Sequence, residues 1–188
     1  MLSLLCYNKI VYFKNRVYFR NLNDIRKEET SVSMPPTVVC NNILKRGFSE
    51  KEEISPMKLQ KLMYFVACTY QKKAKTALFS EPFEVWQYGP VLRSVYDEFK
   101  AYGKKPITSY SKDAKGISYI VDESTSPLLK SSIDSIWSKF KDWDAIALSN
   151  ITHQDGSGWS SAYDNRAKTI SNKQMEEDNT YEHDFSSN

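Results

Sequence analysis

The segment from Ser55 to Lys73 constrains the fold of this chain more than any other. Ser55-Pro56 places a good N-cap residue before a proline at the first helical position, which is typical of a helix start. Apolar side chains then recur at helical spacing on two flanks, so the helix must be covered on more than one side. We therefore expect residues 57–73 to form the central core helix. The first flank is Leu59, Leu62, Met63, Val66 and Tyr70, and the second is Tyr64, Phe65 and Cys68.

Further helices are predicted on both sides of this one. Residues 37–47 favour a short helix that Gly47 can close in the left-handed conformation. Pro90 can begin a helix that ends at Gly103, and Ser126-Pro127 repeats the cap-and-proline signal. The remaining helical stretches are one capped by Asp142 or Asp144, one near Ser161 and one over residues 171–177.

A small β element is also expected. Residues 82–88 favour a short strand that Gly89-Pro90 ends with a turn, and residues 117–121 could pair with the Phe83 segment. The predicted fold class is thus mainly α: a compact multi-helix domain around the central helix with a small antiparallel β element.

The two ends of the chain differ in composition from the body, which we place at residues 34–175. Residues 1–33 contain the β-prone runs 10–13 and 17–19, and two interpretations compete. The segment is either an N-terminal hairpin or arm, or a poorly ordered leader upstream of a natural start at Met34; the second is favoured. Residues 176–188 form an acidic tail whose low apolar content predicts disorder.

Charge argues against nucleic acid as the main ligand. The formal net charge is +3, but residues 1–33 hold six Lys/Arg against three Asp/Glu, which leaves 20 of each for the rest of the chain. A nucleic-acid-binding surface normally needs a clustered basic patch.

The sequence also predicts a cytoplasmic protein without disulfides or a zinc site. No run approaches the roughly 18 apolar residues that a membrane span needs, and the first residues do not resemble a secretory signal. Cys6, Cys40 and Cys68 are odd in number and lack a CxxC pair, so they are interpreted as ordinary thiols.

One histidine carries the most chemical interest. Thr152-His153 lies near Asp155 and Trp159, and a histidine beside a carboxylate can act as a general base or metal ligand. No catalytic or nucleotide-binding motif accompanies it, so structural hydrogen bonding or partner contact is favoured, with no metal or cofactor.

Aromatic and basic residues give two further hypotheses. Trp86, Tyr88 and Tyr96 could form a recognition surface, since such residues carry interface hot spots, although at least half could be core. Lysines of the central helix are interpreted as a solvated face, with an acidic partner as the alternative. They are Lys58, Lys61, Lys72, Lys73 and Lys75.

Three segments carry a resemblance to a known family. They are residues 58–65, residues 83–91 with their continuation to Gly103, and residues 148–153 followed by Trp159 and Ala162. In this order they resemble the Panacea or SocA-like antitoxin family, which includes phage-associated GepA-like proteins. Gly158 stands where the family usually has a proline before the tryptophan, so the loop 153–159 is expected to be more flexible here.

The resemblance implies a protein-binding module and not an enzyme. Members of this family neutralise a toxin by direct contact, and in one branch the antitoxin is an adaptor that delivers the toxin to the ClpXP protease. The expected partner is therefore a toxin, another host or phage protein, or ClpX; a hydrolase using His153 is a weaker alternative. The candidate partner-binding residues are Trp86, Tyr88, Gly89, Pro90, Tyr96, Thr152, His153 and Trp159.

Overall fold

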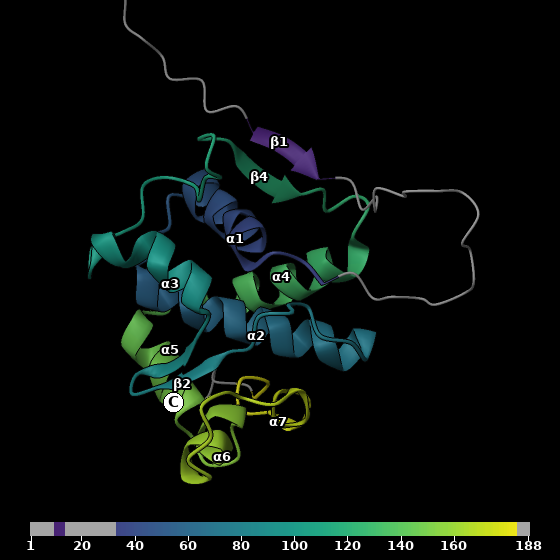
Figure 1. Cartoon of the computed structure of the whole chain (residues 1–188), viewed down its shortest axis with the longest axis vertical. Coiled ribbons are helices and arrows are strands. Elements are labelled where there is room, and N and C mark those ends of the chain that lie inside the picture. The colour runs from purple at the N-terminus through teal and green to yellow at the C-terminus, as the bar shows by residue number, and fades with distance from the viewer. Residues whose placement is uncertain (1–9, 14–32, 184–188) are drawn as a thin grey trace, which may run out of the picture.

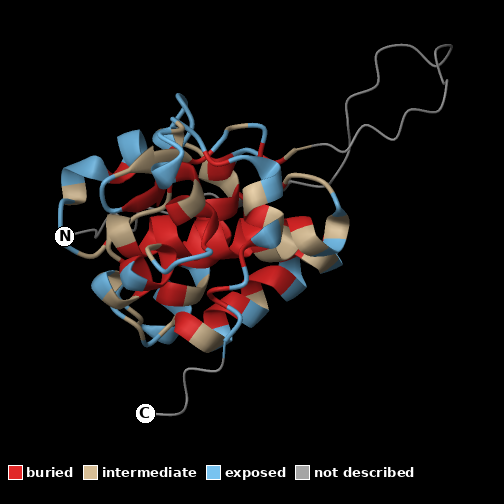
Figure 2. Cartoon of the chain, turned by 90° about the horizontal axis from the view of Figure 1, so that it is seen from below, coloured by how far each residue is buried: buried red, intermediate tan, exposed pale blue. Residues whose placement is uncertain are grey.

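The computed structural model describes residues 10–13 and 33–183, and its helices gather around one long helix, α2 (Pro56–Ala74) (Figure 1). This helix begins as predicted, with the Ser55 hydroxyl accepting a hydrogen bond from the Lys58 amide. Both predicted apolar flanks are buried apart from half-buried Tyr70, and the buried residues form the centre of Figure 2. Each fully buried large apolar side chain contributes roughly 1.5–3 kcal/mol to stability. Because α2 buries so many of them, it forms the centre of the hydrophobic core.

Helix α1 (Pro36–Glu50) continues past its predicted end. The prediction that Gly47 closes this helix is wrong: Gly47 lies within the helix, and Lys51 takes the left-handed conformation with a φ of 62°. A Cβ at Gly47 would lie 2.6 Å from Cδ1 of Ile54. The glycine therefore serves packing, because it lets the buried Ile54 side chain approach the helix.

The small antiparallel element is a hairpin of β2 (Glu84–Trp86) and β3 (Gly89–Val91), in which Trp86 pairs with Gly89. The predicted strand is confirmed, but Gly89-Pro90 belongs to the second strand and does not end the element. The next helix, α3 (Arg93–Phe99), consequently starts after the predicted position and runs into a 3-10 turn at residues 100–102.

The second pair of strands differs from the predicted pairing. Strand β4 (Ser118–Val121) pairs in parallel with β1 (Ile10–Phe13), so its predicted pairing with the Phe83 segment is wrong. Two buried side chains of α1 explain this: Asn41 donates to Tyr119 O at 2.9 Å, and Asn42 exchanges two hydrogen bonds with the Val121 backbone. Residues 1–9 and 14–32 of the proposed leader lie outside the described residues.

The C-terminal half supplies α4 (Pro127–Phe140), α5 (Ala145–Thr152), α6 (Gly158–Asp164) and α7 (Asn172–Glu177). Asp144, one of the two predicted caps, accepts from the Ala147 amide, and Ser157 and Ser171 cap the last two helices. Helices α4, α5 and α7 all contact α2. The body is thus mainly helical, as predicted.

The start of the predicted acidic tail is packed against the body, in contrast to the predicted disorder. Asp178, Thr180 and Tyr181 are buried, and the Tyr181 ring stacks on Phe65 with centroids 5.1 Å apart. Lys72 donates to Asn179 Oδ1 at 2.7 Å. Residues 184–188 lie outside the described residues.

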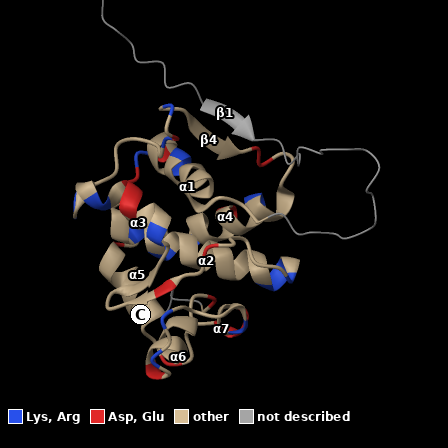
Figure 3. Cartoon of the chain, in the orientation of Figure 1, with Lys and Arg blue, Asp and Glu red and all other residues tan. Residues whose placement is uncertain are grey.

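Across the described ranges, no helix combines the length and apolar character needed to cross a membrane. Cys40 and Cys68 are buried free thiols, as expected, and burial raises the pKa of both; Cys6 lies outside the described residues. Figure 3 shows that residues of both charge signs are spread over several elements, α3 among them.

Candidate protein-binding surface

Side chains from α5 and α6 hold the turn of the β2–β3 hairpin by its main chain. Trp159 Nε1 donates to Trp86 O at 3.0 Å, His153 Nε2 lies 3.1 Å from Gln87 O, and Ser149 Oγ donates to Tyr88 O at 3.0 Å. Three successive carbonyls are thereby tied to neighbouring helices. The turn is therefore held in position through its main chain.

His153 has a structural position in this junction. Its Nδ1 lies 2.6 Å from Ser149 O and its Nε2 faces Gln87 O, so both ring nitrogens are next to main-chain carbonyls. Its ring centroid is 3.9 Å from that of the buried Trp159. A neutral imidazole can donate to one of these carbonyls and an imidazolium to both. The geometry agrees with the structural hydrogen bonding considered from the sequence.

Gly89 lies over a buried polar layer. Its φ is +103°, and a Cβ there would lie 2.6 Å from Lys61 Nζ and 2.7 Å from Thr152 Oγ1. Thr152 is fully buried and its hydroxyl donates to Ser149 O at 2.7 Å. Only glycine combines this backbone conformation with such a close approach.

The predicted solvated lysine face is wrong for two of its members. Lys58 is 6% exposed and Lys61 is 1% exposed, and Lys61 donates to Pro90 O at 3.4 Å. Burial lowers the pKa of both side chains, that of Lys61 to about 7. The sequence could not show this, because Lys61 becomes buried when the hairpin packs over α2.

Exposed apolar side chains gather on the outer side of the same junction. We call the following group the hairpin surface: exposed Tyr88, Tyr96, Ile146 and Tyr163, with half-buried Trp86 and His153. Tyr88 is 66% and Ile146 68% exposed, and Ile146 lies one helical turn before Ser149, which contacts the hairpin. Tyr163 stacks on Trp159 at 4.7 Å, and Tyr96 packs edge-on against Trp86 at 4.7 Å.

The structure brings all eight sequence-predicted site residues to this one junction, at different depths. Tyr88 and Tyr96 are exposed, and Trp86 and His153 are half-buried; the buried members are Gly89, Pro90, Thr152 and Trp159. None of the three aromatic residues of the predicted surface belongs to the core. Ile146 and Tyr163 were missed, although the four-residue spacing from Trp159 to Tyr163 could have placed Tyr163 on the same helix face.

Gly158 also departs from its expected role. Its amide donates to Asp178 Oδ2 at 2.9 Å, and a Cβ would lie 2.5 Å from the Tyr64 hydroxyl. The buried glycine begins α6 behind the Ser157 cap, so this end of the loop is fixed and not flexible.

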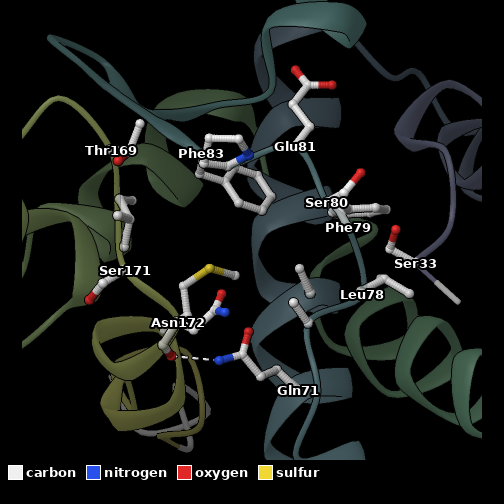
Figure 4. Close-up of a pocket in the computed structure, with 15 residues that line it drawn as sticks. Ser33, Gln71, Leu78, Phe79, Ser80, Glu81, Phe83, Thr169, Ser171 and Asn172 are labelled. Carbon is white, nitrogen blue, oxygen red and sulfur yellow. Dashed lines mark hydrogen bonds between the residues drawn. The ribbon is translucent and has the colours of Figure 1, made fainter. Parts of the chain in front are cut away.

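A cavity of about 480 Å³ lies beside α2, away from the hairpin turn (Figure 4). Two of its polar side chains already contact the protein: Gln71 Nε2 donates to Asn172 O, drawn as the dashed line, and Glu81 accepts from the Ser94 amide. Other lining residues include Leu78, Phe79, Phe83, Ile170 and Met175. No charged group of this lining is left pointing at a defined ligand position, so the hairpin surface is the better candidate.

Together the fold and this surface define a small, mainly helical domain that presents a rigid hairpin. A family model described as antitoxin SocA-like, Panacea domain, matches residues 59–160, more than half of the chain. The chain therefore belongs to the SocA-like antitoxin family, which confirms the resemblance.

A relative supports the same assignment. Antitoxin SocA of Caulobacter vibrioides (strain NA1000 / CB15N) is 28% identical over 130 residues, covering 68% of this chain and 69% of the relative. No solved structure gives a significant match.

Proposed function

We propose that this chain is a cytoplasmic antitoxin-type binding protein that neutralises a partner protein by direct contact, without enzymatic turnover, through the hairpin surface. The observation that carries the proposal is the distribution of exposed apolar side chains. Among the described residues, the exposed large hydrophobic side chains are those of the hairpin surface and Phe48. Contiguous exposed apolar groups mark interaction sites, and tyrosine and tryptophan are enriched in hot spots.

Rigidity supports the proposal as well. Ordering a loop on binding reduces affinity, whereas a surface already held in one conformation avoids that cost. The hydrogen bonds from Ser149, His153 and Trp159 fix the hairpin turn before any partner arrives. Tyr88 is thus presented from a preorganised main chain.

Family membership supports the antitoxin role in particular. The relative from Caulobacter carries the name antitoxin, and the family match spans the hairpin, α5 and the start of α6. We carry the role to this chain as part of the proposal, with the toxin as the expected protein partner.

The test begins with a small adjacent reading frame in the source genome. Its product should stop growth when expressed alone and be harmless when expressed with this chain. Tyr88→Ser combined with Ile146→Ser should abolish protection, because these are the two most exposed side chains of the hairpin surface. Phe48→Ser is the matched control: Phe48 is also exposed but lies on α1. Protection that survives the double substitution would contradict the use of this surface.

A further inference from the structure

Lys61 lies directly beneath the hairpin surface, where a cationic side chain is costly. It comes from the middle of α2, is 1% exposed, and donates to Pro90 O at 3.4 Å. No salt bridge to Lys61 occurs within residues 10–13 and 33–183. A buried amine without a carboxylate partner reduces stability. We therefore expect Lys61 to serve a purpose other than stabilising the fold.

The neighbouring polar groups show what this amine contacts. A Cβ at Gly89 would lie within 2.8 Å of both Nζ and Cε of Lys61, so β3 rests on the end of the lysine side chain. Thr152 on α5 approaches the same point. Lys61 therefore lies where α2, β3 and α5 meet.

Titratable groups on the surrounding elements are few. They are His153 at the C-cap of α5, Glu84 on β2, and Lys58 and Tyr64 on the adjacent turns of α2, whereas β3 contributes Gly89, Pro90 and Val91. Burial alone accounts for the lowered pKa of Lys61, about 7. The charge of this amine therefore changes near neutral pH, with little influence from neighbouring charges.

Lys58 provides a natural comparison on the same helix. It is also buried, but Nζ donates to Lys141 O, and Glu52, Asp142 and Asp144 act to raise its pKa against the effect of burial. Lys58 therefore contacts the segment between α4 and α5 and not the hairpin. A substitution there tests the loss of a buried lysine without altering the base of the hairpin.

We infer that Lys61 is a positioning residue of the hairpin surface: its amino group holds β3 on α2 through Pro90 O and thereby fixes Tyr88 relative to α5. This inference rests on the proposed function for its biological meaning. If the hairpin lifts off α2, the amine becomes solvated and its pKa returns toward the ordinary value of lysine, so the opened hairpin binds a proton more readily than the closed one. Protonation therefore favours opening, and the hairpin is held more tightly above about pH 7 than below it.

The test measures amide hydrogen exchange of residues 86–91 in the full-length chain. Lys61→Met keeps the length of the side chain and removes both the donor and the titrating amine, so we expect hairpin exchange, corrected for the intrinsic effect of pH, to lose the pH dependence of the wild type. Lys58→Met should leave hairpin exchange at the wild-type rate. Equal hairpin exchange in the two variants would overturn the inference.

A second measurement uses the wild-type chain, in case Lys61→Met does not fold. Hairpin exchange, corrected for the intrinsic effect of pH and compared with amides of α2, should slow as pH rises above about 7. His153→Gln should keep this step, since the step belongs to Lys61. A flat profile, or a step that disappears in His153→Gln, would overturn the inference.

Neither measurement requires the partner. Hairpin exchange that does not depend on Lys61 would disprove the positioning role without affecting the neutralisation assay. Conversely, a failed neutralisation assay would remove the proposed function without changing the exchange rates.

Discussion

Asp178 and Lys61 are both buried ionisable side chains: Asp178 lies in the C-terminal segment that packs against α2, and Lys61 projects from α2 beneath the hairpin. The Asp178 carboxylate accepts hydrogen bonds from the Tyr64 hydroxyl, the Gly158 amide, and the amide and hydroxyl of Thr180. The Lys61 amine has Pro90 O, at 3.4 Å. The first group is fully satisfied and the second is weakly satisfied.

This difference in hydrogen bonding distinguishes a buried group that stabilises the fold from one that serves binding. A buried polar group with all its hydrogen bonds made stiffens the surrounding structure, whereas one with few hydrogen bonds costs stability. The satisfied group joins the C-terminal segment to the body. The weakly satisfied one lies under the exposed aromatic side chains, where a loss of stability is acceptable if it serves binding.

The largest expected effect is at the satisfied site. Asp178→Ala leaves the Tyr64 hydroxyl and the Gly158 amide buried without their acceptor, so we expect a loss of about 3–5 kcal/mol in the free energy of unfolding. Urea denaturation measures it. Asp164→Ala, an exposed aspartate at the end of α6, should change stability by less than about 0.5 kcal/mol. Similar losses in both variants would show that the comparison is wrong.

Gly89→Ala should have the next largest effect. The new Cβ would meet Lys61 Nζ at 2.6 Å in a backbone conformation with φ of +103°, and we expect a loss of about 2–4 kcal/mol. Gly156→Ala is the matched control, because Gly156 has a φ of +85° with open space around it. If both variants lose the same free energy by thermal or urea unfolding, backbone conformation alone explains the glycine.

Lys61→Met should increase the free energy of unfolding, in contrast to the two substitutions above, which lower it. Between about pH 7 and pH 10.5 the unfolded chain binds one more proton at Lys61 than the folded chain, so wild-type stability rises with pH across that window. The variant lacks this dependence, and we expect it to be more stable by about 2 kcal/mol near pH 6, with the advantage shrinking toward pH 10.5.

Denaturation at several pH values checks this expectation. Parallel pH dependences in the variant and the wild type would contradict it. In Lys61→Met, global stability and hairpin protection should therefore both lose the pH dependence that Lys61 gives the wild type.

Substitutions of the exposed residues should have the smallest effect on stability. Tyr88→Ser and Ile146→Ser remove side chains that are 66% and 68% exposed, so each should alter the free energy of unfolding by less than about 0.5 kcal/mol. Calorimetry of the two variants is the measurement. A larger loss would mean that these side chains stabilise the fold and are not available to a partner.

Local signals made part of the fold predictable. Ser55-Pro56 determined the start of α2, and Asp144 the start of α5, because each cap acts on amides within its own helix turn. The β4 pairing was not predictable, since Asn41 and Asn42 select it through contacts about 80 residues away in the chain. Gly47 was misjudged because its small size, and not its φ, is what the fold uses.

The candidate site was predictable in outline. Trp86, Tyr88 and His153 lie in motif segments, and the structure brings those segments together. Lys61 has the spacing of a surface lysine, and its burial depends on tertiary packing over α2. Ile146 was not singled out from the sequence, because an apolar residue in a short helix gives no sign of which side is covered.

The hydrogen bonds to the carbonyls of residues 86–88 also bear on how this surface could evolve. Every amino acid has a carbonyl, so the anchoring of the turn does not depend on which side chains occupy positions 87 and 88. Gln87 and Tyr88 could then be exchanged for other residues while the turn keeps its shape. Related chains could acquire new binding preferences by altering these two positions, without having to rebuild the scaffold.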